Sequence, residues 1–290
     1  MNDQAILIVI TFIVLTLIIW VRVVRKRKKL EEKLKEVIPE LWRETLQQKI
    51  TFYSKLEEGD KILFEKRVQR FLATKTIDGI DTEIDDTIRL MVAASAIIPT
   101  FAFPKYNYPG VRAILIYPNS FDEEFQTGRY EGHKEVIMGM VGDRYMNGSV
   151  ILSKPDLVKA FDGLPHKENV GIHEFVHLLD KEDGIIDGIP GALIDQKFAG
   201  PWLHEIKKEM SKIEKGNSDI NPYALTSNAE FLAVVSEYFF DNPDKFKKRH
   251  SELYGFLATI FNSDTAVMHP AYHSPEAEHI PAGEKIRVLV

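Results

Sequence analysis

The sequence predicts an α+β fold that is helix-rich, has a small sheet, and is preceded by one N-terminal transmembrane helix. Three observations predict it. The segment 170–180 carries two histidines four residues apart, above an apolar stripe with helical spacing. The short apolar runs 111–117, 135–141 and 149–152 come before it, bounded by Pro, Gly and Asn, and predict strands. An uncharged run over residues 4–21 is long enough to span a bilayer.

Composition and charge exclude several classes of protein. A chain of 290 residues, 44% of them hydrophobic, has room for one large domain or two small ones. The absence of cysteine excludes disulfides, a cysteine nucleophile and thiolate metal ligands. The net charge of −6 is unevenly divided, since residues 22–35 carry +6, Asp3 carries −1 and residues 36–290 carry −11. An acidic body of this kind argues against a nucleic-acid-binding surface.

Residues 1–24 are predicted to form a membrane anchor. The run from Gln4 to Val21 would make a helix about 27 Å long, close to the hydrocarbon thickness of a bilayer. A cleavable signal peptide is the main alternative, but the chain has neither a basic start nor a small-residue cleavage site. The basic residues 25–29 follow the run directly, so the positive-inside rule places the rest of the chain in the cytoplasm. We therefore expect a single-pass protein of the cell membrane.

After the anchor, the pattern divides the chain into three further parts. Residues 25–104 predict a helical part without chemistry of its own, and residues 105–262 carry the strands and the histidine helix. Residues 263–290 form a tail, whose three histidines lack helical spacing and are weak evidence for a metal.

Several helices are expected from apolar periodicity and from their end signals. Thr82 and Asp85 resemble a capping box that opens a helix ended by Pro99. The other expected helices cover residues 28–50 with an interruption at Pro39, 55–74, 155–161, 201–213, 228–240 and 243–261.

The segment 170–180 contains the pattern His-Glu-x-x-His. Residues i and i+4 share one face of a helix, so His173 and His177 can bind one metal ion together. Two neutral imidazoles and one further protein ligand leave a fourth zinc position open for water. Glu174 lies beside this site, where a carboxylate can take the proton of the water as general base. The alternative is a chance match on an amphipathic helix, which the clean apolar back face disfavours.

Asp180 lies on the same helical face as the two histidines. It can orient a ligand imidazole through a hydrogen bond, or it can cap the helix end, and the sequence does not decide between these roles. Two Asp-Gly pairs follow, at residues 183–184 and 187–188, and predict tight turns.

A third metal ligand is expected on the helix over residues 228–240, which is largely apolar but carries Glu230 and Glu237. Burying a carboxylate at an inward position destabilises the folded state unless the carboxylate is paired or bound to a metal. The two glutamates are seven residues apart, which is about 10.5 Å along the helix axis. Only one of them can therefore bind the ion. Glu230 lies near the helix start, where a substrate has room, and is the predicted ligand. The alternatives are a capping box of Glu230 with Ser227 and, for Glu237, a hydrogen bond accepted from a histidine or a buried ion pair.

With these residues in view, the sequence resembles the Mlc titration factor A family of zinc-dependent peptidases. The matching motifs are residues 173–180, the turn segment 183–190, and Tyr223-Ala placed seven residues before Glu230. The likeness extends over roughly residues 30–261 at the level of element order.

The resemblance implies that His173, His177 and Glu230 bind zinc, that Glu174 is the catalytic base, and that Tyr223 hydrogen-bonds the developing oxyanion. The spacing from Tyr to Glu is also similar to that in the metalloprotease domain of anthrax lethal factor, which implies a zincin fold. The family further implies aminopeptidase-like activity on small peptides and, in enteric bacteria, binding to a glucose repressor protein.

The chain departs from the family pattern at two places near the expected cleft. Family members usually carry a Trp-Gly pair where this chain has residues 142–148, and a proline commonly stands at the position of Asn228. An N-terminal anchor is also unusual in the family. These departures affect the detail of the substrate cleft and leave the metal ligands unchanged.

The sequence thus predicts a membrane-anchored zinc metallopeptidase that hydrolyses peptides or proteins. A peptide can lie along the edge of the sheet beside the metal. The alternative is a module that binds a regulatory protein and uses zinc mainly for structure. A structural zinc site is normally closed by four protein ligands, and the sequence offers three, which favours catalysis.

Overall fold

The computed structural model describes residues 3–120, 138–141, 148–164 and 167–266, without the side chains of residues 3, 5–9 and 33. The three histidines of the predicted tail lie outside the described residues. The chain forms two compact units, residues 1–39 and residues 40–290.

The first unit contains one long helix, α1 (Asp3–Lys33). Among the residues that the structure describes, no helix is long and apolar enough to cross a membrane, so the predicted transmembrane anchor is not supported. Large apolar side chains on α1 are solvent-exposed, Phe12 by 70% and Trp20 by 62%.

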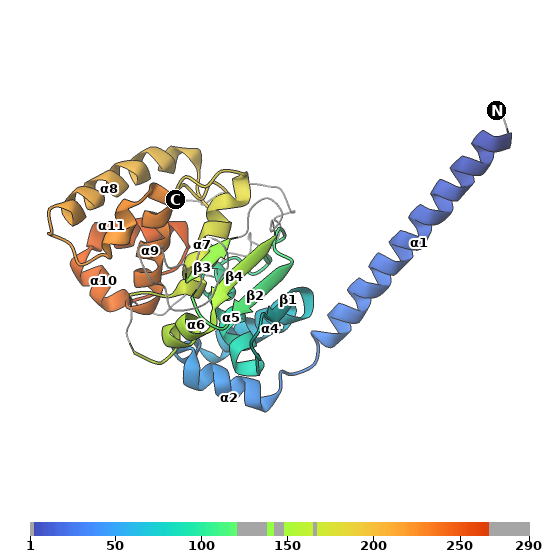
Figure 1. Ribbon diagram of the computed structural model, residues 1–290, viewed down its shortest axis with the longest axis horizontal. Helices are drawn as coiled ribbons and strands as arrows, with labels where there is room; N and C mark the ends of the chain where they lie inside the picture. The colour runs from blue at the N-terminus through green and yellow to red at the C-terminus, as the bar shows by residue number, and fades with distance from the viewer. Residues whose placement is uncertain (1–2, 121–137, 142–147, 165–166, 267–290) are drawn as a thin grey trace. The chain divides into compact units, whose positions relative to one another are not determined.

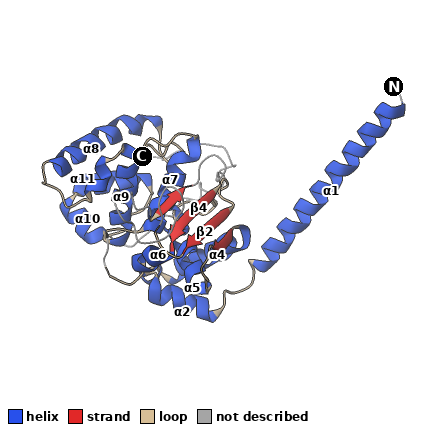
Figure 2. Cartoon of the chain, in the orientation of Figure 1, coloured by secondary structure: helices blue, strands red, loops and turns tan. Residues whose placement is uncertain are grey.

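The second unit is rich in helices, which surround a small sheet (Figures 1 and 2). Its α-helices are α2 (Glu40–Lys49), α3 (Thr51–Ser54), α4 (Glu58–Thr74), α5 (Asp86–Ile97), α6 (Lys154–Ala160), α7 (Val170–Asp180), α8 (Gln196–Glu214), α9 (Asn228–Asp241), α10 (Pro243–Arg249) and α11 (Ser251–Ile260). Short 3-10 helices are η1 (Ile98–Thr100), η3 (Lys181–Asp183) and η4 (Pro222–Leu225).

Three of the expected helices differ from the prediction. Helix α8 begins at Gln196, before the expected start at Pro201, because the Asp195 side chain caps it by accepting a hydrogen bond from the backbone N–H of Lys197. Asp85 itself caps α5, because its side chain accepts a hydrogen bond from the backbone N–H of Ile88 at 2.9 Å, so the expected capping box with Thr82 is wrong. The single helix expected over residues 243–261 is divided into α10 and α11 at His250, whose backbone is not helical.

The sheet has four strands among the described residues, in the order β1-β2-β4-β3. They are β1 (Thr76–Gly79), β2 (Ala113–Tyr117), β3 (Gly139–Val141) and β4 (Ser149–Ser153). β1, β2 and β4 run parallel, and β3 pairs antiparallel with β4 at the edge. The predicted α+β class with a small sheet is therefore confirmed. The sequence did not predict β1, which has a single buried apolar side chain, Ile77.

Helix α7 lies at the centre of the second unit. It contacts β3, β4, α5 and α9. Its apolar stripe packs inward as predicted, with the side chains of Ile172, Phe175, Val176 and Leu179 at most 1% exposed. A Cβ atom on Gly171 would lie 2.0 Å from the Oγ atom of Ser95, so this glycine permits the close approach of α5 and α7.

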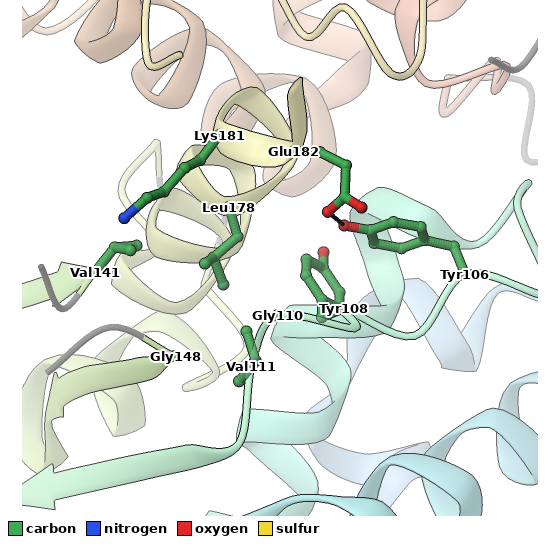
Figure 3. Close-up of a pocket in the computed structure, with 9 residues that line it drawn as sticks. All are labelled: Tyr106, Tyr108, Gly110, Val111, Val141, Gly148, Leu178, Lys181 and Glu182. Carbon is green, nitrogen blue, oxygen red and sulfur yellow. Dashed lines mark hydrogen bonds between the residues drawn. The ribbon is translucent and has the colours of Figure 1, made fainter. Parts of the chain in front are cut away.

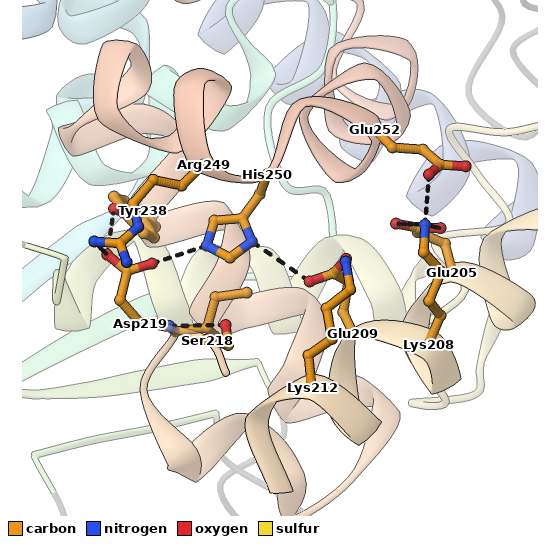
Figure 4. Close-up of polar contacts among 11 residues, drawn as sticks. Glu205, Lys208, Glu209, Lys212, Ser218, Asp219, Tyr238, Arg249, His250 and Glu252 are labelled. Atoms are coloured by element: carbon orange, nitrogen blue, oxygen red, sulfur yellow. Dashed lines mark hydrogen bonds and ion pairs between the residues drawn. The ribbon is translucent and has the colours of Figure 1, made fainter. Parts of the chain in front are cut away.

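A buried polar network around His250 joins α8, α9 and the junction of α10 with α11 (Figure 4). The imidazole lies between two carboxylates, with Nε2 2.8 Å from Asp219 Oδ1 and Nδ1 3.4 Å from Glu209 Oε2. Asp219 Oδ2 also accepts hydrogen bonds from Lys167 Nζ at 2.8 Å and from the Tyr238 hydroxyl at 3.0 Å. Since Tyr238 belongs to α9, the network fixes the back of the helix that carries Glu230.

The charges around His250 change its proton affinity. Burial lowers the pKa of His250, but the hydrogen bonds and charges of Glu209 and Asp219 outweigh burial and raise that pKa above its ordinary value. A group whose pKa is raised on folding stabilises the folded state fully below its unfolded pKa, about 6.5 for histidine. That contribution is lost as the pH rises through the raised pKa.

We predict that His250→Gln lowers the free energy of unfolding at pH 6 by about 1–3 kcal/mol, because Asp219 and the buried Glu209 lose the positive charge between them. The wild-type protein should lose stability above about pH 6.5, and this loss should be absent in the variant. Urea denaturation at a series of pH values measures both effects. The exposed His204, changed to Gln, is the control. Parallel pH profiles for the wild type and His250→Gln would contradict the prediction.

Candidate metal centre

Helices α7 and α9 bring three possible metal ligands together. His173 and His177 of α7 and Glu230 of α9 each offer one ligand atom, and these atoms lie within 4.8 Å of one another. The two Nε2 atoms are 3.1 Å apart. Glu230 Oε2 is 3.0 Å from His173 Nε2, and Glu230 Oε1 is 3.4 Å from His177 Nε2.

These distances fit a tetrahedral metal site. Ligand atoms about 2.0–2.1 Å from a common zinc ion are separated from one another by about 3.3 Å. The three observed separations scatter around this value, from 3.0 to 3.4 Å. The side chains of His173, His177 and Glu230 remain 14%, 11% and 20% exposed, so solvent reaches the centre. The donor set of two imidazoles and one carboxylate could therefore hold a metal ion at a site that water can enter.

Glu237 orients the first histidine. Its Oε1 atom lies 2.6 Å from His173 Nδ1, so an Nδ1–H donates to Glu237 and the lone pair of Nε2 faces the metal site. The other oxygen, Oε2, accepts a hydrogen bond from the backbone N–H of Asn169. Of the two alternatives that the sequence left open for Glu237, the structure shows the hydrogen bond with a histidine. Among the described residues, no Lys or Arg forms an ion pair with Glu237.

The sequence did not identify Asn169 as part of the site. Its side chain caps α7 by accepting a hydrogen bond from the backbone N–H of Ile172 at 3.0 Å, while its own N–H binds Glu237. One residue thus fixes the start of α7 and links it to α9. An Asn directly before an apolar helical run is an N-cap signal, and that signal could have indicated it.

Glu174 is positioned by the edge strand of the sheet. It is 5% exposed, and a Cβ atom on Gly139 of β3 would lie 2.7 Å from its Oε1 atom and 2.8 Å from its Cγ atom. A side chain at position 139 would displace the carboxylate, so this glycine was a second residue that the sequence analysis missed. A lone glycine in a short strand marks such a close approach.

Burial also affects the proton affinity of the two carboxylates near the histidines. It raises the pKa of Glu174 above its ordinary value, although the nearby histidines oppose this effect. Burial also tends to raise the pKa of Glu230. Hydrogen bonds from His173 and His177 outweigh this effect and hold the pKa of Glu230 well below its usual range. Glu230 is therefore a carboxylate anion suited to a metal, and Glu174 is the better proton acceptor.

The expected capping box of Ser227 with Glu230 is half formed. Ser227 caps α9 by accepting a hydrogen bond from the backbone N–H of Glu230 at 3.1 Å. The Glu230 side chain instead points to the histidines. The cap thus holds the backbone of Glu230 while its carboxylate is available to a metal.

Tyr223 lies on η4, and its ring centroid is 6.2 Å from that of His173. Its side chain is 46% exposed. The structure therefore brings this tyrosine beside the histidines, as the resemblance implied, and its hydrogen bond to an oxyanion stays a prediction.

Asp180 takes neither of the roles considered for it. Its Oδ2 atom accepts a hydrogen bond from the backbone N–H of Gly188 at 2.8 Å, and Lys181 occupies the C-cap position of α7. Within the described structure, His177 Nδ1 has no hydrogen-bond partner. Asp180 therefore fixes the loop that follows the histidine helix.

Comparison with known proteins gives the family. Residues 21–262 match the model of the glucose-regulated metallo-peptidase M90 family. The chain belongs to this family. The match includes every element of the candidate centre, from β3 to α9.

Individual relatives agree with the family match. The uncharacterized protein slr2042 of Synechocystis is 30% identical over 233 residues, which cover 77% of this chain and 84% of the relative. Mlc titration factor A of Escherichia fergusonii is 27% identical over 234 residues, covering 77% of this chain and 86% of that protein. The corresponding protein of Cronobacter sakazakii is 28% identical over 207 residues, covering 68% and 76%. The predicted resemblance to the Mlc titration factor A family is confirmed.

We predict that the two glutamates of α9 respond differently to substitution. Glu230→Ala should abolish stoichiometric metal binding, because it removes one of three ligands. Glu237→Ala should still bind one metal ion at saturation, with an affinity lower by about 10–100-fold, because it removes the partner of a ligand histidine. Metal analysis after dialysis against buffered zinc measures both, with circular dichroism as the check on folding. The reverse pattern would assign the ligand to Glu237.

Proposed function

We propose that this chain is a zinc-dependent peptidase that hydrolyses peptide bonds, with aminopeptidase-like activity. The observation that supports the proposal most directly is the meeting of His173, His177 and Glu230 within 4.8 Å, with Glu174 held beside them by β3. A zinc ion bound there would act as a Lewis acid on the scissile carbonyl and lower the pKa of its water.

The side chains around the centre supply the remaining steps. Glu174 accepts the proton of the attacking water and delivers it to the leaving nitrogen. Its raised pKa, caused by burial, brings this carboxyl closer to the working pH of a general base. The hydroxyl of Tyr223 donates a hydrogen bond to the carbonyl oxygen as negative charge develops on it. Glu237 keeps the His173 ring in the tautomer and orientation that zinc requires.

The edge of the sheet offers a place for the substrate backbone. One edge of β3 pairs with β4, and the other has no strand partner among the residues described. Gly139 lies on this strand against Glu174. An extended peptide that adds to the free edge of β3 would therefore pass the proton acceptor.

The alternative function is the binding of a regulatory protein, with zinc in a structural role. The name Mlc titration factor A indicates that those relatives act on a protein called Mlc. The described structure supplies three ligands to the centre, whereas a structural zinc site is normally closed by four. The geometry thus favours catalysis.

We also propose that residues 3–33 bring the protein to the cytoplasmic face of the cell membrane. Exposed apolar side chains between Ile10 and Val23 and the basic residues 25–29 support this location, since both contribute to binding at an anionic lipid surface.

We predict that Glu174→Gln retains zinc but lowers peptide turnover by about 10²–10⁴-fold, because an amide cannot accept the proton of water. Turnover of a fluorogenic peptide and zinc content are measured on the same sample, with and without a chelator. A turnover within about tenfold of wild type would exclude the general-base role.

For Tyr223→Phe, we expect turnover to fall by about 10²–10³-fold with zinc content unchanged, because one hydrogen-bond donor to the oxyanion is lost. The matched control is Tyr117→Phe, which removes a hydroxyl from β2. If turnover in Tyr223→Phe equals that of the control, Tyr223 has no part in the reaction.

The proposed location predicts that the full chain sediments with vesicles containing anionic lipid. Leu15→Glu should reduce the sedimented fraction, because Leu15 is 54% exposed in α1. Leu164→Glu, at an apolar position of the second unit that is 65% exposed, should not. Equal sedimentation of both variants would contradict the proposal.

A further inference from the structure

A cavity of about 250 Å³ lies at the C-terminal end of α7, the helix that carries His173 and His177 (Figure 3). Its walls come from the segment before β2, from β3 and from the end of α7 with η3, and include Tyr108, Val111, Val141 and Leu178. The volume suits one large amino-acid side chain and is below that of most sites for larger ligands, which exceed about 300 Å³.

Tyr108 has an unsatisfied hydroxyl in this cavity. The residue is 2% exposed, and its hydroxyl lies near Thr100 but makes no hydrogen bond of good geometry among the described atoms. Figure 3 shows the hydroxyl pointing toward the space between Leu178 and Glu182. The backbone of Tyr108 is left-handed, with φ of 45°, which is strained for a bulky residue. Strain and an unpaired buried hydroxyl together are typical of ligand-binding positions.

The cavity is aligned with the proposed path of the substrate. On β3, Gly139 lies against Glu174, and Val141, two residues further along, lines the cavity. Two residues of a strand measure about 6.6 Å, and side chains at i and i+2 point to the same face. An extended peptide on the edge of β3 would therefore place one side chain in the cavity when its scissile bond is beside Glu174.

Charges of both signs flank the cavity. From the end of α7, Lys181 extends toward Val141 and Glu182 toward Tyr106 (Figure 3). Glu182 accepts a hydrogen bond from the Tyr106 hydroxyl at 2.8 Å. The other lining residues are uncharged, so they would not replace the hydration of a charged occupant. The lining thus favours a neutral side chain.

The rings of Tyr106 and Tyr108 favour an aromatic occupant. Their centroids are 5.0 Å apart and their planes lie at 72°, an edge-to-face arrangement that a third ring in the cavity could extend. A hydroxyl on that ring could either donate to or accept from the hydroxyl of Tyr108.

We propose that this cavity is a subsite for the side chain of a tyrosine placed two residues from the scissile bond of a peptide substrate. The inference rests on the proposed peptidase function for the position of that bond. Phenylalanine would fill the same space but leave the Tyr108 hydroxyl unpaired, and a site with a buried polar group rejects the analogue that cannot pair with it.

The test measures binding without cleavage. The zinc-loaded Glu174→Gln protein is titrated by calorimetry with the peptides Ala-Ala-Tyr-Ala-Ala-amide and Ala-Ala-Phe-Ala-Ala-amide, which both have a free amino terminus. The Tyr peptide should bind about tenfold more tightly than the Phe peptide, the effect of about one hydrogen bond. Analogues with Lys or Glu at the central position should bind more weakly than either.

Two further variants assign the preference to the cavity. Adding Tyr108→Phe should reduce the ratio of the two affinities to about one, because it removes the hydroxyl that distinguishes the two peptides, and thermal denaturation checks that the variant is folded. Val141→Phe, which fills the cavity from β3, should weaken binding of the Tyr peptide and likewise remove the preference. If the two peptides bind Glu174→Gln equally, or if Tyr108→Phe keeps the preference, the subsite proposal is wrong.

The binding test separates this proposal from the proposed function. A wild-type protein that hydrolyses no peptide, while its Glu174→Gln form still prefers the Tyr peptide, would refute the peptidase and retain the subsite. Hydrolysis without the preference would refute the subsite and retain the peptidase.

Discussion

The contact between α7 and α9 is the interaction on which the rest of the structure depends. Glu237 holds it together from the middle of α9, because one carboxylate oxygen binds His173 and the other binds the backbone N–H at the start of α7. A buried carboxylate is costly without such partners. The pairing also sets the position of Glu230, two turns earlier on the same helix. The three candidate metal ligands thus lie on two helices that are joined by a shared polar contact.

The sequence predicted the part of the centre that is local. His173, Glu174 and His177 lie within one turn of an amphipathic helix, so their spacing alone places them on one edge. Glu230 is 57 residues from His173, and only the cost of burying an acid in an apolar helix indicated its importance. The same reasoning left the partner of Glu237 open, since the sequence does not show which helices pack together.

Other features depend on tertiary structure that no local pattern encodes. Strand β1 forms because β2 supplies its hydrogen bonds, not because its own residues favour a strand. The break between α10 and α11 occurs where His250 turns toward Glu209 and Asp219 on distant segments. The cavity at Tyr108 similarly requires β3, the end of α7 and the segment before β2 to meet. Gly139 shows the same dependence, because its role is to leave space for Glu174.

The central claim is that a zinc ion is bound by His173, His177 and Glu230 and that Glu237 acts only through His173. A crystal structure of the zinc-loaded protein, with anomalous scattering measured at the zinc absorption edge, tests it most directly. The account predicts one strong peak about 2.0–2.2 Å from the two Nε2 atoms and one Glu230 oxygen, with a water molecule completing the site. A peak bonded to a Glu237 oxygen, or a site closed by a fourth protein ligand, would contradict it.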